Sequence, residues 1–222
     1  MEAGTLYGVG VGPGDPELMT LKAVKTALAC DLIAVPHKDA AKCTALKIAL
    51  GAAPELAEKP LLTVDMPMTK DADLLEESYR KGAALLEAEL AQGKNVCFLT
   101  LGDPTVYSTY LYLHQRVTIP GVTSFCGAAA ALGISLCEND QQLHIIPGTY
   151  TPTQALQLPG VKVMMKNNLP ATLEALKAMG ATAAMVENCG MENEKVYPHF
   201  ADLKEPSGYF SLVIVKGETE EC

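Results

Sequence analysis

Leu-Thr-Leu-Gly-Asp-Pro-Thr-Val-Tyr-Ser, at residues 99–108, continues an apolar run that begins at Val96. Such a run predicts a strand that is buried on both faces, as in a parallel sheet. Gly102 permits a ligand to approach the backbone, and Pro104 fixes φ where a helix begins. Because open α/β sheets bind ligands at the carboxyl ends of their strands, Gly102 and Asp103 are candidate site residues. The alternative interpretation is that Asp103 only caps the helix that follows.

A second loop of the same composition lies near the N-terminus. A strand over residues 5–11 leads into Gly12-Pro13-Gly14-Asp15-Pro16, and a helix is predicted over residues 17–29 with Asp15 as its N-cap. The helical spacing predicts a buried face formed by Leu18, Leu21, Val24 and Leu28. The glycines match neither a dinucleotide fingerprint nor a P-loop, because the third glycine and a Gly-Lys-Ser/Thr sequence are missing. An acidic residue at the helix N-terminus also disfavours phosphate there, so the loop suits a cationic or neutral ligand.

Composition and charge exclude several classes of protein. The 222 residues carry a net charge of −9 with no cluster of basic residues, which argues against a nucleic-acid partner. No apolar run approaches the roughly 18 residues of a membrane span, and the first residues lack the basic start of a secretory signal. The 7 cysteines include no Cys-x-x-Cys pair, which favours reduced thiols over a zinc site or a thiol redox centre. We therefore expect a cytoplasmic protein without a metal of its own and without a membrane partner.

Strand and helix patterns alternate through the first half of the chain. Strands are expected over residues 31–36 and 96–101, an extended segment over 60–66, and helices over 40–50 and 71–92. The longer helix is expected to place in the core Leu74, Leu75, Leu85, Leu86 and Leu90. This alternation predicts a parallel sheet with helices on both faces.

The junction near Val117 does not fit this pattern. A helix that carries Tyr107, Tyr110 and His114 and continues to Val117 would pass almost directly into the strand end at residues 118–119. A returning connection normally needs several residues. We therefore hypothesise that a flexible stretch is absent from the sequence near Val117.

The second half of the chain predicts a mixed sheet. A small-residue helix over 125–132 is followed by expected strands at 144–146, 161–165, 183–187 and 210–215, with a helix over 170–179. The pieces 186–190 and 195–198 indicate a hairpin, hence antiparallel pairing. We predict two α/β domains, an N-terminal one over residues 1–121 and a C-terminal one over residues 122–222.

Three motifs, each at the end of a predicted strand, carry a family resemblance. They are Tyr-Gly-Val-Gly-Val-Gly-Pro-Gly-Asp-Pro at 7–16, Thr-Leu-Gly-Asp-Pro-Thr-Val-Tyr-Ser-Thr at 100–109 and Ile-Pro-Gly-Val-Thr-Ser-Phe at 119–125. Together they resemble the tetrapyrrole methylase family. Residues 103–113, 186–191 and 208–212 are most similar to those members that methylate C20 of precorrin-2 or cobalt-precorrin-2 (cobalt-factor II) in cobalamin biosynthesis.

The resemblance implies a homodimeric methyltransferase of two α/β domains with the active-site cleft between them. The N-terminal domain would lie on the tetrapyrrole side, and the C-terminal domain would complete the site for S-adenosylmethionine. The residues implied to contact this cofactor are Pro13, Gly102, Asp103, Val106, Tyr107, Thr123, Ser124, Met165, Cys189 and Ser211. The residues expected to bind the substrate and its carboxylate arms are Gly12, Gly14, Asp15, His37, Lys38 and Lys166. The alternative is that Lys38 and Lys166 are solvated surface charges.

The implied reaction is attack by an electron-rich meso carbon on an already activated methyl group, so orientation is the main task of the protein. The reaction also removes the C20 proton, and a base could assist this step. The candidates for this base, chosen by position alone, are His37, His114, Glu187 and Asp15. For each histidine, a structural role is the alternative. No residues have the spacing of metal ligands, so any cobalt belongs to the substrate. Two other functions remain open: methylation of a different acceptor, such as another corrin carbon, and a non-catalytic S-adenosylmethionine-binding dimer.

Overall fold

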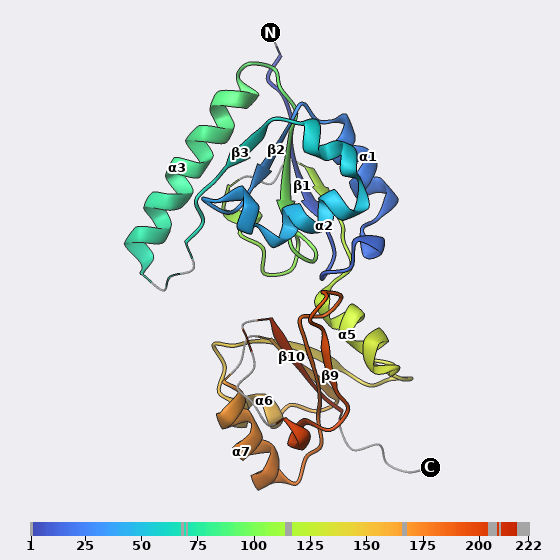
Figure 1. The fold of residues 1–222 in the computed structure, drawn as a ribbon. Coiled ribbons are helices and arrows are strands. Elements are labelled where there is room, and N and C mark those ends of the chain that lie inside the picture. The colour runs from blue at the N-terminus through green and yellow to red at the C-terminus, as the bar shows by residue number, and fades with distance from the viewer. Residues whose placement is uncertain are drawn as a thin grey trace. The chain divides into compact units, whose positions relative to one another are not determined.

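The structure is a computed structural model that describes residues 2–67, 69, 71–113, 117–165, 168–203, 208 and 210–216. Figure 1 shows the two compact units into which the chain divides, residues 1–123 and 124–222. Each unit is built around one five-stranded sheet. No helix in the described ranges is long and apolar enough to cross a membrane.

The sheet of the N-terminal unit is parallel throughout, which confirms the prediction from alternating strands and helices. Its strands are β1 (Leu6–Gly10), β2 (Leu32–Val35), β3 (Leu61–Thr63), β4 (Val96–Thr100) and β5 (Val117–Ile119). Their order across the sheet is β3-β2-β4-β1-β5. The connecting helices are α1 (Leu21–Ala29), α2 (Thr44–Ala52), α3 (Ala72–Leu90) and α4 (Tyr110–Leu113), with the 3-10 turns η1 (Pro16–Leu18), η2 (Ala40–Lys42) and η3 (Pro54–Glu58).

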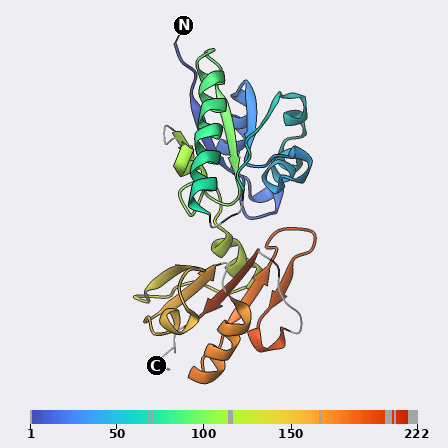
Figure 2. The ribbon, with the colours of Figure 1, turned by 90° about the vertical axis from the view of Figure 1, so that its left-hand side faces the viewer.

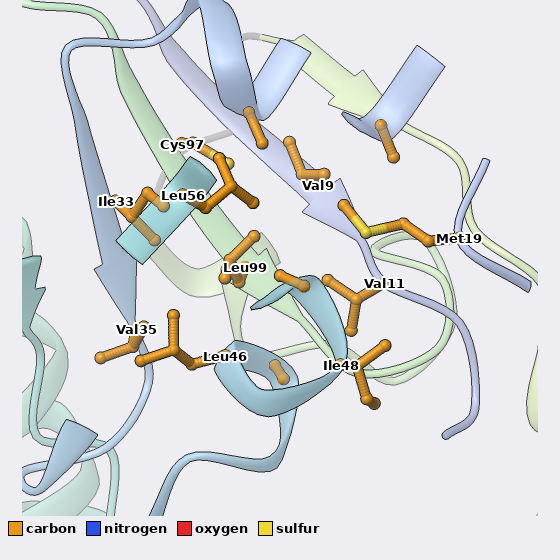
Figure 3. Packing of buried hydrophobic residues seen from close by; sticks show 14 of the residues in the cluster. Val9, Val11, Met19, Ile33, Val35, Leu46, Ile48, Leu56, Cys97 and Leu99 are labelled. Atoms are coloured by element: carbon orange, nitrogen blue, oxygen red, sulfur yellow. The ribbon is translucent and has the colours of Figure 1, made fainter. Parts of the chain in front are cut away.

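Helices cover both faces of this sheet. On one face α1 and α2 pack against strand residues that include Val9 and Leu99, in the apolar cluster of Figure 3. On the other face Leu86 of α3 and Tyr110 of α4 pack against Phe98. The neighbouring strands β1 and β4 are thus followed by helices on opposite faces of the sheet. In open α/β sheets, ligands bind outside the carboxyl ends of two such strands.

The ring of Tyr110 occupies the space of a side chain on β1. A Cβ at Gly8 would lie 2.3 Å from this ring, closer than any real contact. The Tyr110 hydroxyl donates a hydrogen bond of 3.4 Å to the carbonyl of Leu6, and its ring centroid lies 5.8 Å from that of Phe98. The helix α4 therefore packs directly on the sheet only because residue 8 is glycine.

The predicted helix over residues 17–29 is wrong in its start and in part of its buried face, since Leu21 and Leu28 are exposed whereas Val24 packs against the core. The chain first makes η1, and Thr20 then caps α1 by accepting a hydrogen bond of 3.1 Å from the Ala23 N–H. Leu21 is 78% exposed, whereas Ala23 and Ala27 are fully buried. Because the helix restarts after Thr20, its alanines face the sheet, and their small side chains let α1 lie close to it.

Two leucines of α3 expected in the core are exposed instead. Leu74 and Leu85 lie on the outer side of the helix, whereas Leu86 is buried together with Gly82. A Cβ at Gly82 would lie 2.7 Å from the Val64 side chain. The close approach at Gly82 fixes which face of α3 turns toward the core.

The predicted helix as far as Val117 is also wrong. The helix α4 ends at Leu113, and Val117 begins β5, where it pairs with Tyr7 of β1. The hypothesis of an absent stretch concerns residues 114–116, which lie outside the described residues, as does the candidate base His114.

The C-terminal unit holds the mixed sheet that the sequence predicts. Its strands are β6 (Leu143–Pro147), β7 (Val161–Met165), β8 (Ala184–Glu187), β9 (Lys195–Tyr197) and β10 (Ser211–Val215), in the order β6-β7-β10-β8-β9. Among its described strands, β6 and β7 alone pair in parallel, and β8 and β9 form the expected hairpin. Its helices are α5 (Ser124–Leu132), α6 (Pro152–Leu156) and α7 (Leu169–Met179), with the 3-10 turn η4 (Phe200–Asp202).

One face of this sheet is covered by α6 and α7, as Figure 2 shows. The short helix α6 was not predicted. It begins with a capping box, in which Thr151 and Gln154 satisfy each other's backbone N–H groups.

Candidate functional site

The two glycine loops meet at the carboxyl edge of the N-terminal sheet. The N–H of Gly102 donates a hydrogen bond of 2.8 Å to the carbonyl of Gly12, and the N–H of Gly12 donates one of 3.2 Å to the carbonyl of Gly102. This single antiparallel bridge joins the loop after β1 to the loop after β4. Pro13 and Gly14, next to the bridge, are buried. The two loops therefore form one surface.

Close backbone contacts require glycine at two positions of this edge, and a positive φ favours it at a third. A Cβ at Gly121 would lie 2.2 Å from the carbonyl oxygen of Gly102, and one at Gly10 would lie 2.6 Å from the same oxygen. Gly102 differs from the other two. It has a φ of +70°, and a Cβ there would meet no atom within 4 Å. Its backbone thus faces open space, where a ligand can approach it.

The carboxylate of Asp103 holds the edge together. It is 8% exposed, and its Oδ2 accepts a hydrogen bond of 2.9 Å from the N–H of Gly121. Its Oδ1 accepts hydrogen bonds from the N–H of Thr105, at 2.8 Å, and from the Thr105 hydroxyl. Asp103 therefore does more than begin the next turn, because it ties the loop after β4 to the loop after β5.

The remainder of the loop after β4 is also fixed by side chains. The hydroxyls of Thr100 and Ser108 form a buried hydrogen bond of 2.9 Å, and the Ser108 oxygen accepts another from the Tyr110 N–H at 3.2 Å. Tyr107 and Val106 lie between Thr100 and Ser108 in the chain. Tyr107 has a φ of +48° and is 55% exposed, while Val106 is half-buried. A left-handed conformation is costly for tyrosine, so the buried hydrogen bonds hold the loop in a strained shape.

The predicted substrate-binding residues of the N-terminal unit lie in loops of the same edge. Asp15 accepts the Glu17 N–H at 2.9 Å and so caps η1. His37 and the exposed Lys38 follow β2. His37 Nδ1 accepts a hydrogen bond of 2.9 Å from the Asp39 N–H, so a neutral His37 ring carries its proton on Nε2. Lys166 lies outside the described residues.

The site residues predicted in the C-terminal unit gather at one edge of its own sheet. Met165 ends β7 and pairs with Leu212, while Glu187 ends β8 and pairs with Ser211. Glu187 is buried, and its Oε1 accepts a hydrogen bond from the Gly208 N–H. Its carboxylate therefore has a structural partner.

Cys189 lies in the turn after β8, between Asn188 and Gly190, which both have positive φ angles. Burial, and next the negative charge of Glu194, raise the pKa of the Cys189 thiol to about 11. Cys189 therefore stays a neutral thiol at physiological pH and is a poor nucleophile there.

Thr123 and Ser124, the two remaining residues predicted to contact the cofactor, flank the boundary in the sequence between the two units. Thr123 Oγ1 is buried and has no hydrogen-bond partner among the described residues. Ser124 is the first residue of α5. No three histidine, cysteine, aspartate or glutamate side chains come together as a metal site anywhere in the described ranges.

Sequence reasoning missed the contacts of Gly10 and Gly121 and the pairing of Thr100 with Ser108. A glycine directly at a strand end was a usable signal for Gly10, and the Pro-Gly pair after β5 was one for Gly121. The hydroxyl pair left no signal, because only the path of the folded loop brings Thr100 and Ser108 together.

Comparison with known proteins gives matches over most of the chain. The family model of tetrapyrrole (corrin/porphyrin) methylases matches residues 5–204. A precorrin-2 C(20)-methyltransferase from a Sinorhizobium species is 34% identical over 237 residues, with 96% of each chain covered. A cobalt-precorrin-2 C(20)-methyltransferase from Salmonella typhimurium is 31% identical over 236 residues, with 98% of each chain covered.

A solved structure has the same fold. It is a uroporphyrin-III C-methyl transferase from Thermus thermophilus, complexed with S-adenyl homocysteine, and it matches with a TM-score of 0.68. The match covers 97% of this chain and 98% of that one at 22% identity. At this identity the likeness concerns the fold alone.

Proposed function

The chain belongs to the tetrapyrrole (corrin/porphyrin) methylase family, and from this membership we propose that it methylates C20 of precorrin-2 or cobalt-precorrin-2 in cobalamin biosynthesis, with S-adenosylmethionine as methyl donor. The observation that carries the proposal is the likeness to two C20-methyltransferases, at 34% and 31% identity, over nearly the full length of each. One of these relatives is named for the metal-free acceptor and the other for the cobalt form. Both acceptors therefore belong in the assay.

Two features of the described residues fit S-adenosylmethionine. Gly102 presents its backbone to open space at the carboxyl edge of the sheet. Thr123 Oγ1 is a buried hydroxyl oxygen with no partner in the described part of the chain, and such a group needs one. A bound ligand with polar atoms would supply this partner. The cofactor contributes a methyl group on a positively charged sulfur, which needs no covalent activation by the protein.

The loops of the N-terminal sheet would position this cofactor. In the proposal, Gly102, Val106 and Tyr107 contact it, and Asp103 holds their loop against the backbone of Gly121. Pro13 lies beside the Gly12–Gly102 bridge and lines the same edge. The other proposed contacts are Thr123, Ser124, Met165, Cys189 and Ser211. The chain's contribution to the reaction is then mainly orientation of the methyl group and exclusion of water.

The acceptor carries several carboxylates, whereas the chain has a net charge of −9. Salt screens repulsion between them beyond about 10 Å, so the groups near the site decide binding. We propose that His37 Nε2–H and the Lys38 ammonium bind carboxylate arms of the acceptor. The tautomer that Asp39 imposes makes His37 Nε2 a hydrogen-bond donor rather than a base. Gly12, Gly14 and Asp15 complete the proposed substrate side.

We also propose that the protein acts as a homodimer in the cytoplasm, as the family resemblance implies. Calorimetry with S-adenosylhomocysteine, together with light scattering, measures cofactor binding and oligomeric state in one preparation. Binding to a dimer supports the proposal. A monomer, or a dimer that does not bind the nucleoside, contradicts it.

Methyl transfer is tested by incubating the purified chain with S-adenosylmethionine labelled in its methyl group and with precorrin-2, with and without cobalt. The expected product carries the label at C20, as seen by carbon NMR. A label at another corrin carbon would instead identify a different methylase of the family. Binding of S-adenosylhomocysteine without transfer to either acceptor would favour the non-catalytic dimer.

A further inference from the structure

A cavity lies beside the helix α1 in the N-terminal unit. Its volume is about 500 Å³, which is within the range of sites for small organic ligands. The polar residues that line it come from α1, from the start of β1 and from the position before β4, and they are Tyr7, Lys22, Lys25, Thr26 and Asn95. None of them belongs to the loops after β1, β4 and β5 that form the candidate site.

The polar lining of this cavity favours an anion. Each of its polar side chains can donate a hydrogen bond, and the two lysine ammonium groups can only donate. No carboxylate is among the described residues that line it. The neighbouring acid Asp31 lies outside the lining, and its Oδ2 accepts a hydrogen bond of 2.7 Å from the backbone N–H of Asn95. An anion in the cavity would therefore meet donors and no lining carboxylate.

The charges of Lys22 and Lys25 are not balanced by the part of the chain that the structure describes. Neither ammonium takes part there in an ion pair or a hydrogen bond, and α1 contains no acidic residue. By contrast, Lys81 and Lys94 each pair with a glutamate of α3, at 2.7 Å and 2.6 Å. Two like charges three residues apart on one helix repel each other. An anion bound between Lys22 and Lys25 would remove this repulsion.

The side chain of Asn95 adds a neutral donor whose orientation is fixed. Its Oδ1 accepts a hydrogen bond of 3.0 Å from the backbone N–H of Thr5, so the amide nitrogen is the end that remains for a ligand. Among the described residues, no acceptor is bound to Asn95 Nδ2. Asn95 is half-buried and directly precedes β4, so the sheet holds it in place.

The rest of the lining is apolar. Leu21 begins α1, Ala29 ends it, and Cys30 follows. Leu21 is 78% exposed, so its side chain offers apolar surface that an organic ligand could remove from water. A bare inorganic ion would leave most of the cavity of about 500 Å³ unfilled. The lining therefore fits an anion that carries an apolar body.

We propose that this cavity binds a small organic dianion, with its charged group between the ammonium groups of Lys22 and Lys25 and its apolar body against Leu21. A phosphate monoester and a dicarboxylate both carry the double charge near neutral pH. They present the same chemistry to the two lysines, and the choice of probes separates them. The proposal is independent of the proposed methyl transfer, because the cavity shares no residue with the proposed cofactor and substrate contacts.

The test measures binding of phenyl phosphate and of phthalate to the full chain by calorimetry, with inorganic phosphate for comparison. At least one of the two ring-bearing dianions should bind, and more tightly than inorganic phosphate, because the ring covers the apolar surface of Leu21. The tighter of the two identifies the ligand class as phosphate monoester or dicarboxylate. The affinity should fall as salt is added, since the lysines are exposed and their charges are screened.

Lys22→Gln and Lys25→Gln should each weaken the binding about tenfold, because each removes one charge-assisted hydrogen bond. Lys47→Gln is the matched control, since Lys47 is an exposed lysine of α2 that does not line the cavity, and it should bind like the wild type. In NMR spectra of the wild type, the side-chain amide signals of Asn95 should shift as the dianion is added. Those of Asn188, in the C-terminal unit, should not shift.

The proposal is overturned if neither ring-bearing dianion binds, if inorganic phosphate binds as tightly, or if Lys47→Gln loses as much affinity as Lys22→Gln and Lys25→Gln. It is equally overturned if S-adenosylhomocysteine displaces the dianion, which would then occupy the proposed cofactor site. Dissociation of a dimer by Lys22→Glu with Lys25→Glu, when no dianion binds the wild type, would assign this face to a second copy of the chain instead. None of these measurements requires methyl transfer, so this site and the proposed function fail separately.

Discussion

The carboxylate of Asp103 and the backbone N–H of Gly121, 18 residues apart in the chain, are joined by a hydrogen bond of 2.9 Å. This bond links the loop after β4 to the loop after β5, while the Gly12–Gly102 bridge links the loop after β4 to the loop after β1. Three loops of the sheet edge are thus held by one buried side chain and one backbone bridge. These bonds hold the N-terminal loops proposed to contact the cofactor in one arrangement, which would lower the entropic cost of binding.

Asp103→Ala is expected to destabilise the chain by about 2–3 kcal/mol, because it leaves two backbone N–H groups without their charged acceptor. Affinity for S-adenosylhomocysteine should also fall. Asp71→Ala is the matched control, since Asp71 caps α3 in the same way but is exposed. The control should lose about 1 kcal/mol and bind normally. Chemical unfolding and calorimetry measure the two effects, and equal losses of affinity in both variants would contradict the role of Asp103.

Gly102→Ala separates backbone strain from occupation of the site. Gly102 and Gly180 have φ angles of +70° and +64°, and a Cβ at either would meet no atom within 4 Å. Both alanine variants should therefore lose a similar roughly 1–2 kcal/mol of stability. Only Gly102→Ala should weaken S-adenosylhomocysteine binding, because its methyl group would enter the space proposed for the ligand. Unchanged affinity in Gly102→Ala would place the cofactor elsewhere.

Lys38→Glu is expected to raise KM for the tetrapyrrole about tenfold, because a carboxylate arm would lose a charged donor and face a negative charge. Affinity for S-adenosylhomocysteine should not change. Lys47→Glu, at an exposed position of α2, alters the net charge by the same amount and serves as control. If both variants raise KM equally, the overall charge of the chain is responsible rather than Lys38.

The thiol of Cys189 should be alkylated by iodoacetamide more slowly than that of Cys126 at about pH 8, since its pKa of about 11 leaves little thiolate. Glu194→Gln should accelerate the reaction, because removal of the negative charge lowers this pKa while burial still keeps it raised. Glu192→Gln, at an exposed neighbouring position, should have no effect. Mass spectrometry of the Cys189 peptide gives the rates, and equal rates for the two variants would contradict the role of Glu194.

The same pKa sets how Cys189 affects stability. At pH values between 9.0, the ordinary pKa of a cysteine, and about 11, the folded chain keeps this thiol protonated. The contribution of the neutral thiol to folding is therefore complete below pH 9.0 and is lost as the pH rises to about 11. Denaturation of the wild type and Cys189→Ala at several pH values should show the difference shrinking across this range.

The strands of both sheets could be predicted from the sequence because buried strands are apolar runs. The run 161–165 was predicted with the bounds that β7 has. The buried faces of helices were harder to predict. The helix α1 begins after a 3-10 turn, at the N-cap Thr20, and this start position places Leu21 on the exposed side. Leucine spacing alone contains no information about where a helix begins.

The candidate site was predictable as two glycine loops at strand ends, but not as one surface. Gly12 and Gly102 pair only because β1 and β4 are neighbours in the sheet, and strand order is not encoded in local periodicity. The double role of Asp103 was missed for the same reason, since its second partner, Gly121, comes from a third strand.

The packing of Tyr110 on Gly8 has a consequence for the history of the family. Neither position can change alone, because a larger residue at 8 would collide with the ring and a smaller residue at 110 would leave a void. Among homologous sequences, residue sizes at these two positions should vary inversely. Such covariation would show that residues 8 and 110, although far apart in the chain, evolve together because their contact attaches α4 to the sheet.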